Sequence, residues 1–143
     1  MRKVLVPIDG SDCALRGVAL VITKRALYLS PENLEIHLVN VQAPFSHDVS
    51  RFVSHNQVAT FHHEESEQAL SEARKLLDSA NVNYTCHYEV GNVAEIITGL
   101  ASSLQCDQIV MGTYGRGALK EFLCGSITLK VVQLSPIPIL LVK

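Results

Sequence analysis

The chain is organised around residues 107–128, which read DQIVMGTYGRGALKEFLCGSIT. The apolar run Ile109–Met111 predicts a buried strand, and a helical pattern runs from Ser126 to about Leu134. A glycine-rich loop joins the two elements. Glycines let a backbone approach an anion closely, and the N–H groups at a helix start supply donors, with Ser126 expected at the N-cap. This segment therefore predicts a phosphate-binding cradle.

Two common phosphate-binding motifs do not describe this loop. A Walker A loop ends in Gly-Lys-Ser/Thr, whereas Gly117 is followed by Ala118. A dinucleotide fingerprint places its glycines after the first strand, which here ends Pro7-Ile8-Asp9-Gly10. The spacing present is Gly112-x2-Gly115-x9-Gly125-Ser126. An ordinary glycine-rich connection between a strand and a helix is the alternative interpretation.

Length and composition predict a single globular domain over residues 1–143. A chain of 143 residues can bury a substantial core but is too short for two domains. Apolar residues make up 48% and charged residues 18%, which favours a sheet covered on both faces. The formal net charge of −2 gives no electrostatic support for nucleic-acid binding.

The sequence shows neither a membrane span nor a signal peptide. No apolar run approaches the ~20 residues that span a bilayer, and the first residues have a strand pattern. We therefore expect a cytoplasmic protein. The cysteines form no Cys-x2-Cys pair, so we expect reduced thiols at Cys13, Cys86, Cys106 and Cys124.

Strands and helices are expected to alternate along the chain. Apolar or alternating runs predict strands over residues 3–8, 34–41, 84–90, 107–111 and 139–142. Apolar residues at helical spacing are Leu15, Ala19, Ile22 and Ala26, then Ala69, Ala73, Leu76, Leu77 and Ala80, then Ile97, Leu100, Ala101 and Leu104. The second of these helices is expected to start near Val58 or Phe61. Residues 42–56 lack periodicity and predict an irregular surface connection.

This alternation predicts a doubly wound, five-stranded parallel sheet with helices on both faces, because parallel strands need right-handed crossovers. The expected strand order is 3-2-1-4-5. Ligands bind such sheets beyond the carboxyl ends of the strands, where the winding reverses. We therefore expect Asp9 to lie beside the glycine-rich loop. Val41 would end the second strand where a purine can lie against apolar side chains.

The loop spacing resembles the ATP-binding signature of the universal stress protein family, and every defined position matches. The similarity covers nearly the whole length. It includes the opening strand and Asp turn at residues 3–11, a helix entry at 91–97, the fourth strand at 107–112 and the closing strand at 136–142. The resemblance implies a Rossmann-like, adenine nucleotide alpha hydrolase-like fold. It also implies ATP, or AMP or ADP, as the ligand, with Mg²⁺ on the phosphates.

The same resemblance implies which residues contact the nucleotide. They are Pro7, Asp9 and Val41 at the nucleoside, Gly112, Gly115, Gly125, Ser126 and Thr128 at the phosphates, and Ile8, Met111 and Ile127 in the same site. Arg116 either reaches a terminal phosphate or is solvated on the loop. Asp9 hydrogen-bonds the nucleoside, contacts phosphate-bound Mg²⁺, or only forms the turn. The chain departs from the family at Asn40, where His is frequent.

The segment Ile139–Val142 is an apolar strand at the edge of the expected sheet, and no later element covers it. Exposed edges of this kind are normally paired or protected. The resemblance implies a homodimer in which this strand pairs antiparallel with the same strand of a second copy. We also expect a protein partner, which the sequence does not identify.

The residue pattern favours a nucleotide-dependent stress-response or signalling module over an enzyme. No histidine is evidently placed to activate Ser126, and the third strand ends Glu89-Val90-Gly91, without the Asp of a phosphoacceptor. A slow ATP hydrolase or nucleotide-dependent transferase using the same cradle is one alternative, and a nucleotide-free dimeric scaffold is another. At His62-His63 a solvated helix face is favoured over a metal site, because adjacent helical residues point about 100° apart.

Overall fold

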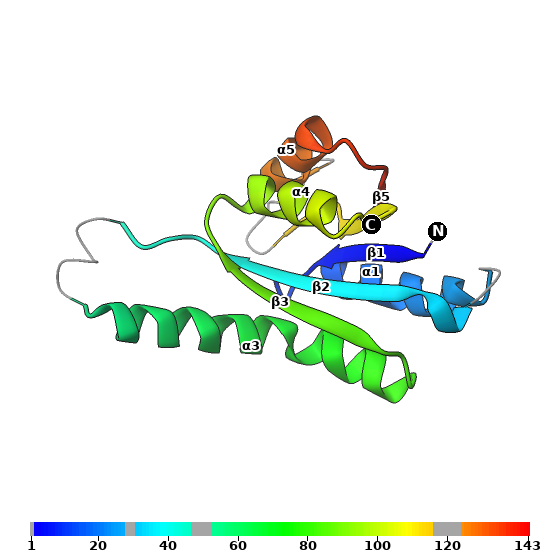
Figure 1. Cartoon of the computed structure of the whole chain (residues 1–143), viewed down its shortest axis with the longest axis horizontal. Helices are drawn as coiled ribbons and strands as arrows, with labels where there is room; N and C mark the ends of the chain where they lie inside the picture. The colour runs from blue at the N-terminus through cyan, green and yellow to red at the C-terminus, as the bar shows by residue number, and fades with distance from the viewer. Residues whose placement is uncertain (1, 28–30, 47–52, 116–123) are drawn as a thin grey trace.

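The structure is a computed structural model that describes residues 2–27, 31–46, 53–115 and 124–143 (Figure 1). Its elements are β1 (Lys3–Pro7), α1 (Asp12–Lys24), η1 (Arg25–Leu27), η2 (Pro31–Asn33), β2 (Glu35–Gln42), α3 (His55–Ser79), β3 (Tyr84–Val90), α4 (Val93–Ser103), β4 (Gln108–Gly112), α5 (Ser126–Leu134) and β5 (Ile139–Val142). Strands and helices therefore alternate as the sequence predicts. No helix in these ranges combines the length and the apolar character that a bilayer span requires.

The five strands form one parallel sheet in the order β3-β2-β1-β4-β5. The strand β1 lies at its centre, where Val4 is opposite Ile36 of β2 on one side and Gln108 of β4 on the other. Helices α1 and α3 cover one face, and α4 and α5 cover the other (Figure 1). The predicted doubly wound sheet and its strand order are confirmed.

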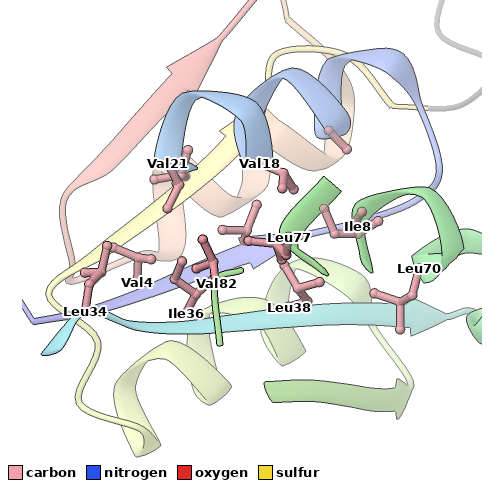
Figure 2. Close-up of a cluster of buried hydrophobic side chains, with 14 residues drawn as sticks. Val4, Ile8, Val18, Val21, Leu34, Ile36, Leu38, Leu70, Leu77 and Val82 are labelled. Carbon is pink, nitrogen blue, oxygen red and sulfur yellow. The ribbon is translucent and has the colours of Figure 1, made fainter. Parts of the chain in front are cut away.

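The central strand is buried on both faces, which explains its nearly continuous apolar sequence. Val4, Leu5 and Val6 are all fully buried. The face toward α1 and α3 packs Val4, Ile36, Leu38, Val18, Val21, Leu70 and Leu77 (Figure 2). The opposite face packs Leu5, Val39, Ile109, Ala94, Ile97 and Val131. Each of the larger side chains stabilises the fold by about 1.5–3 kcal/mol through its burial.

Helix α1 packs on the sheet through small residues, and its apolar stripe differs from the predicted one. The buried residues are Cys13, Ala14, Gly17, Val18 and Val21. Of the predicted stripe, Ala19 and Ala26 are exposed and Leu15 and Ile22 are half-buried. A Cβ added to Gly17 would lie 3.8 Å from Val110 Cγ1. The small face lets the helix approach the sheet, so the larger side chains lie at its rim.

Helix α3 begins at His55, earlier than its apolar stripe predicts. Ser54 Oγ accepts a hydrogen bond from Gln57 N at 3.3 Å, and Gln57 Oε1 accepts one from Ser54 N at 3.0 Å. This capping box fixes the start of the helix through polar groups, so a stripe of apolar residues cannot predict where the helix begins. Residues 47–52 of the predicted irregular connection lie outside the described residues.

The end of β4 packs tightly against the first turn of α1. A Cβ added to Gly112 would lie 2.7 Å from Cys13 Cβ and 2.9 Å from the Cys13 carbonyl carbon. Only glycine permits such a close approach, because any larger residue would have to displace the α1 backbone. The contact holds the start of α1, and the turn that precedes it, beside the loop that follows β4.

We expect Gly112→Ala to lower the free energy of unfolding by about 1–3 kcal/mol, because the added methyl group overpacks a backbone contact. The matched control is Gly99→Ala within α4, where no heavy atom lies within 4 Å of an added Cβ. That change should raise the free energy of unfolding by about 0.5–1 kcal/mol, since alanine is the better helix former. Urea unfolding measures both values. Equal stability of Gly112→Ala and the parent would contradict the packing.

Candidate functional site

A cleft of about 250 Å³ lies at the carboxyl ends of the central strands. Its walls come from the end of β1 and the turn after it, from β2 and α4, and from the end of β4 and the start of α5. Every predicted contact residue within the described ranges lines this cleft, and Arg116 lies outside those ranges. The strand order thus joins segments that are about a hundred residues apart in sequence.

One part of the cleft is apolar. It is formed by Val39 and Val41 of β2, Val93 and Ile97 of α4, and Met111 of β4. An uncharged ring system can be buried against such side chains. Of these residues, Val39, Val93 and Ile97 were not predicted as site residues. The apolar stripe of α4 predicts that Ile97 faces inward, but a stripe does not distinguish a cleft wall from the core.

Helix α5 begins at the cleft without a side-chain cap. Its N-cap residue is Gly125 (φ −70°, ψ 153°), whose carbonyl accepts a hydrogen bond from Leu129 N at 3.0 Å. The prediction of Ser126 at the N-cap is therefore wrong, because the glycine carbonyl already opens the helical ladder. Within the described residues no side chain caps the first-turn N–H groups. These donors, at the positive end of the helix dipole, remain available to an anion.

The two hydroxyl groups of this first turn have different surroundings. Ser126 is exposed, and its hydroxyl makes no hydrogen bond to any described residue. Thr128 is only 3% exposed, and its Oγ1 donates to Gly112 O at 3.2 Å. The hydroxyl proton of Thr128 is therefore used within the protein, to hold α5 against β4. Ser126 is the hydroxyl that a ligand can reach.

The Asp9 turn and the glycine-rich loop meet, as the strand order predicts. Asp9 Oδ1 accepts a hydrogen bond from Ser11 N at 2.9 Å, and Gly10 has a φ of +81° that favours glycine. A Cβ added to Gly115 would lie 2.7 Å from Asp9 Oδ2. The Asp9 carboxylate therefore lies directly against the loop that follows β4. It is the one carboxylate among the described residues that line the cleft.

Comparison with known proteins agrees with this geometry. The family model described as the universal stress protein family matches residues 1–143. The chain belongs to this family. Universal stress protein MJ0531 of Methanocaldococcus jannaschii is 30% identical, in an alignment that covers 99% of this chain and 82% of the relative.

Two solved structures share the fold of this universal stress protein. The structure of MJ0577 from the same organism gives a TM-score of 0.82 at 29% identity, covering 99% of this chain and 95% of that one. A family protein from Arabidopsis thaliana with AMP bound gives a TM-score of 0.66 at 15% identity, covering 100% of this chain and 92% of that one. The second likeness shows the shared fold alone.

No histidine within the described part of this universal stress protein lines the cleft. His62 is buried, with its ring centroid 4.9 Å from that of Phe45 and 6.1 Å from that of Phe61, so a solvated helix face describes only His63. His37 Nδ1 and His87 Nε2 are 2.9 Å apart on β2 and β3, and burial lowers the pKa of both rings. Across the described residues, no group of three or more His, Cys, Asp or Glu side chains could hold a metal ion.

Proposed function

We propose that this universal stress protein binds an adenine nucleotide, ATP foremost, in the cleft. The observation that carries the proposal is the uncapped start of α5, which lies in the same cleft as an apolar wall. A ligand that fits both parts has an uncharged ring system at one end and an anionic group at the other. A nucleotide has both. The AMP bound to the Arabidopsis relative supports adenine as the base.

The described residues fit such a ligand. The base would lie against Val41 and Met111, and the phosphates would receive N–H groups from the first turn of α5 together with the hydroxyl of Ser126. The glycines at 115 and 125 leave the backbone of the cradle uncovered by side chains. A Mg²⁺ ion would come with the phosphates, neutralise part of their charge, and have Asp9 as its nearest protein carboxylate.

We propose binding and signalling, without rapid turnover, as the role of the cleft. Phosphoryl transfer requires an aligned nucleophile and stabilisation of the developing charge. Among the described lining residues, Asp9 is the one side chain that could act as a base or hold a cation. Occupancy of the cleft would link the Asp9 turn, the β4 end and α5, and so change the surface offered to a protein partner. A slow ATP hydrolase and a nucleotide-free scaffold are the alternative functions.

The domain extent and the cellular setting belong to the same proposal. Residues 1–143 would act as one domain, as their length predicts. The cytoplasmic location, the lack of nucleic-acid binding and the existence of a protein partner stay predictions from the sequence.

The two hydroxyl groups of α5 give a matched test by calorimetric titration with ATP and Mg²⁺. We expect Ser126→Ala to weaken ATP binding about 10-fold, because it removes a charge-assisted hydrogen bond. We expect Thr128→Val to change affinity by less than about threefold, while lowering the free energy of unfolding by about 1 kcal/mol. Unchanged affinity in Ser126→Ala would contradict the placement of the phosphates.

Phosphate release in the same samples distinguishes a binding module from an enzyme. We expect the parent chain to release phosphate at a rate well below about 1 per second. Release at about that rate, lost in Ser126→Ala in step with ATP affinity, would support the hydrolase instead.

We further propose a homodimer that forms through β5. The strand β5 ends the sheet beside β4, and its side chains Leu140 and Leu141 are 40% and 39% exposed. Helix α5 adds further exposed apolar residues, Leu129, Val132 and Leu134. An uncovered apolar edge favours pairing with another strand. An antiparallel pair about a twofold axis would continue the sheet across both copies.

Sedimentation velocity tests the dimer with two leucine-to-lysine variants. Leu140→Lys places charges on both sides of the proposed twofold axis and should shift the protein from dimer to monomer. Leu27→Lys makes the same chemical change at a leucine that is 75% exposed on η1 and should leave the dimer intact. A monomeric parent chain, or a dimer that survives Leu140→Lys, would rule out this interface.

A further inference from the structure

A buried polar network lies directly behind the Asp9 turn, where β2 meets α3. At its centre is Asn40, which is 2% exposed. Asn40 Nδ2 donates a hydrogen bond to Ile8 O at 2.7 Å. Asn40 Oδ1 accepts one from Ser66 Oγ of α3 at 2.8 Å and another from Gln42 Nε2 at 2.8 Å. One side chain therefore joins β2, α3 and the residue that follows β1 at the edge of the cleft.

The orientation of the Asn40 amide follows from its partners. A backbone carbonyl can only accept a hydrogen bond, so the Asn40 atom that contacts Ile8 O must be the nitrogen. The other amide atom is then the oxygen, which can only accept. Ser66 must therefore donate its hydroxyl proton to it, and Gln42 must present its own nitrogen. Each of the three contacts pairs a donor with an acceptor in this one orientation of the Asn40 amide.

Ile8 is held at a point where the β1 ladder has ended. Pro7 is the last residue of β1 and has no N–H group. Ile8 N donates to Val39 O at 2.8 Å, and Ile8 O accepts from the Asn40 side chain. Both polar backbone groups of this residue are thus anchored to β2. Ile8 lines the cleft and directly precedes Asp9, so its anchoring fixes the direction in which the Asp9 turn leaves the sheet.

We propose that Asn40 is a positioning residue for the nucleotide site. This inference rests on the proposed function of the cleft. Asn40 does not line the cleft, and it acts through Ile8 by holding the Asp9 turn against the glycine-rich loop. Ser66 supports it by fixing the amide orientation, which ties helix α3 to the site. Buried networks of this kind hold a site in its binding geometry before the ligand arrives.

The test replaces Asn40 with its nearest isostere, in Asn40→Asp, and follows ATP affinity against pH. Burial raises the pKa of the introduced carboxyl, so a pH of about 5.5 favours its protonated form, which can donate to Ile8 O. At about pH 8.5 it is ionised and repels the same carbonyl. The ratio of variant to parent dissociation constants should therefore rise at least ~10-fold between these pH values. Taking the ratio removes the pH dependence of ATP itself, which the variant and the parent share.

Ser66→Ala is the matched control. It removes a buried hydrogen bond from the same network but keeps the Asn40 donor to Ile8 O. It should lower the unfolding midpoint at every pH, while its affinity ratio stays flat across pH because the change introduces no titratable group. Circular dichroism confirms the native fold of both variants at each pH. A ratio close to one for Asn40→Asp at both pH values, with the parent binding ATP, would overturn the inference.

A second measurement uses the unmodified chain and does not depend on any variant. Nuclear magnetic resonance follows the side-chain amide of Asn40 during titration with ATP and Mg²⁺. We expect its two proton signals to shift together with the backbone signals of Asp9. Shifts at Asp9 without any change at Asn40 would contradict the positioning role. No shift at either residue, with a parent that binds no ATP, would instead refute the proposed function of the cleft.

Discussion

The structure depends on the contact between Gly112 and the first turn of α1. Gly112 has no Cβ, so the backbone of Cys13 can lie directly against this last residue of β4. The Asp9 turn runs directly into this helix, so the same contact sets its distance from the loop after β4. The start of α5 is then tied to the β4 end through Thr128 and Gly125. The cleft is a consequence of how three backbones approach one another.

This origin explains the chemistry of the site. In the proposed function, the donors to an anion are backbone N–H groups, whose positions follow from the packing of α1, β4 and α5 and need no charged side chain. Its apolar wall is continuous with the core beneath α4, where Val39 and Ile97 belong to both. A ligand bound in the cleft would therefore act on the same contacts that stabilise the fold. This is expected of a module whose conformation changes when the ligand binds.

Sequence patterns predicted the sheet because central strands buried on both faces need nearly continuous apolar runs, as in Val4, Leu5 and Val6. The strand order then brought Asp9 and the glycine-rich loop together. The spacing of apolar residues did not predict the buried face of α1 or the first residue of α3, because small or polar residues determine both. The face of α1 is set by Ala14 and Gly17, which carry little hydrophobic signal, and the start of α3 is set by a capping box.

The candidate site, too, could be predicted from the sequence only in part. The glycine spacing pointed to the loop and the helix start that line the cleft, but it could not show that Gly125 takes the N-cap position or that Thr128 donates to Gly112 O, since both depend on tertiary geometry. The role of Asn40 could not be inferred either. Its partners Ile8 and Ser66 are distant in sequence and meet only in the folded chain.

Native mass spectrometry of the full chain tests the central claim most directly. Protein purified without added nucleotide is measured as isolated and again with about 1 mM ATP and Mg²⁺, a concentration that detects even weak binding. The account predicts a mass increase of one adenine nucleotide per chain, with ATP retained as ATP. An unchanged mass in both samples would contradict the nucleotide cleft, and ADP as the one bound species would favour the hydrolase.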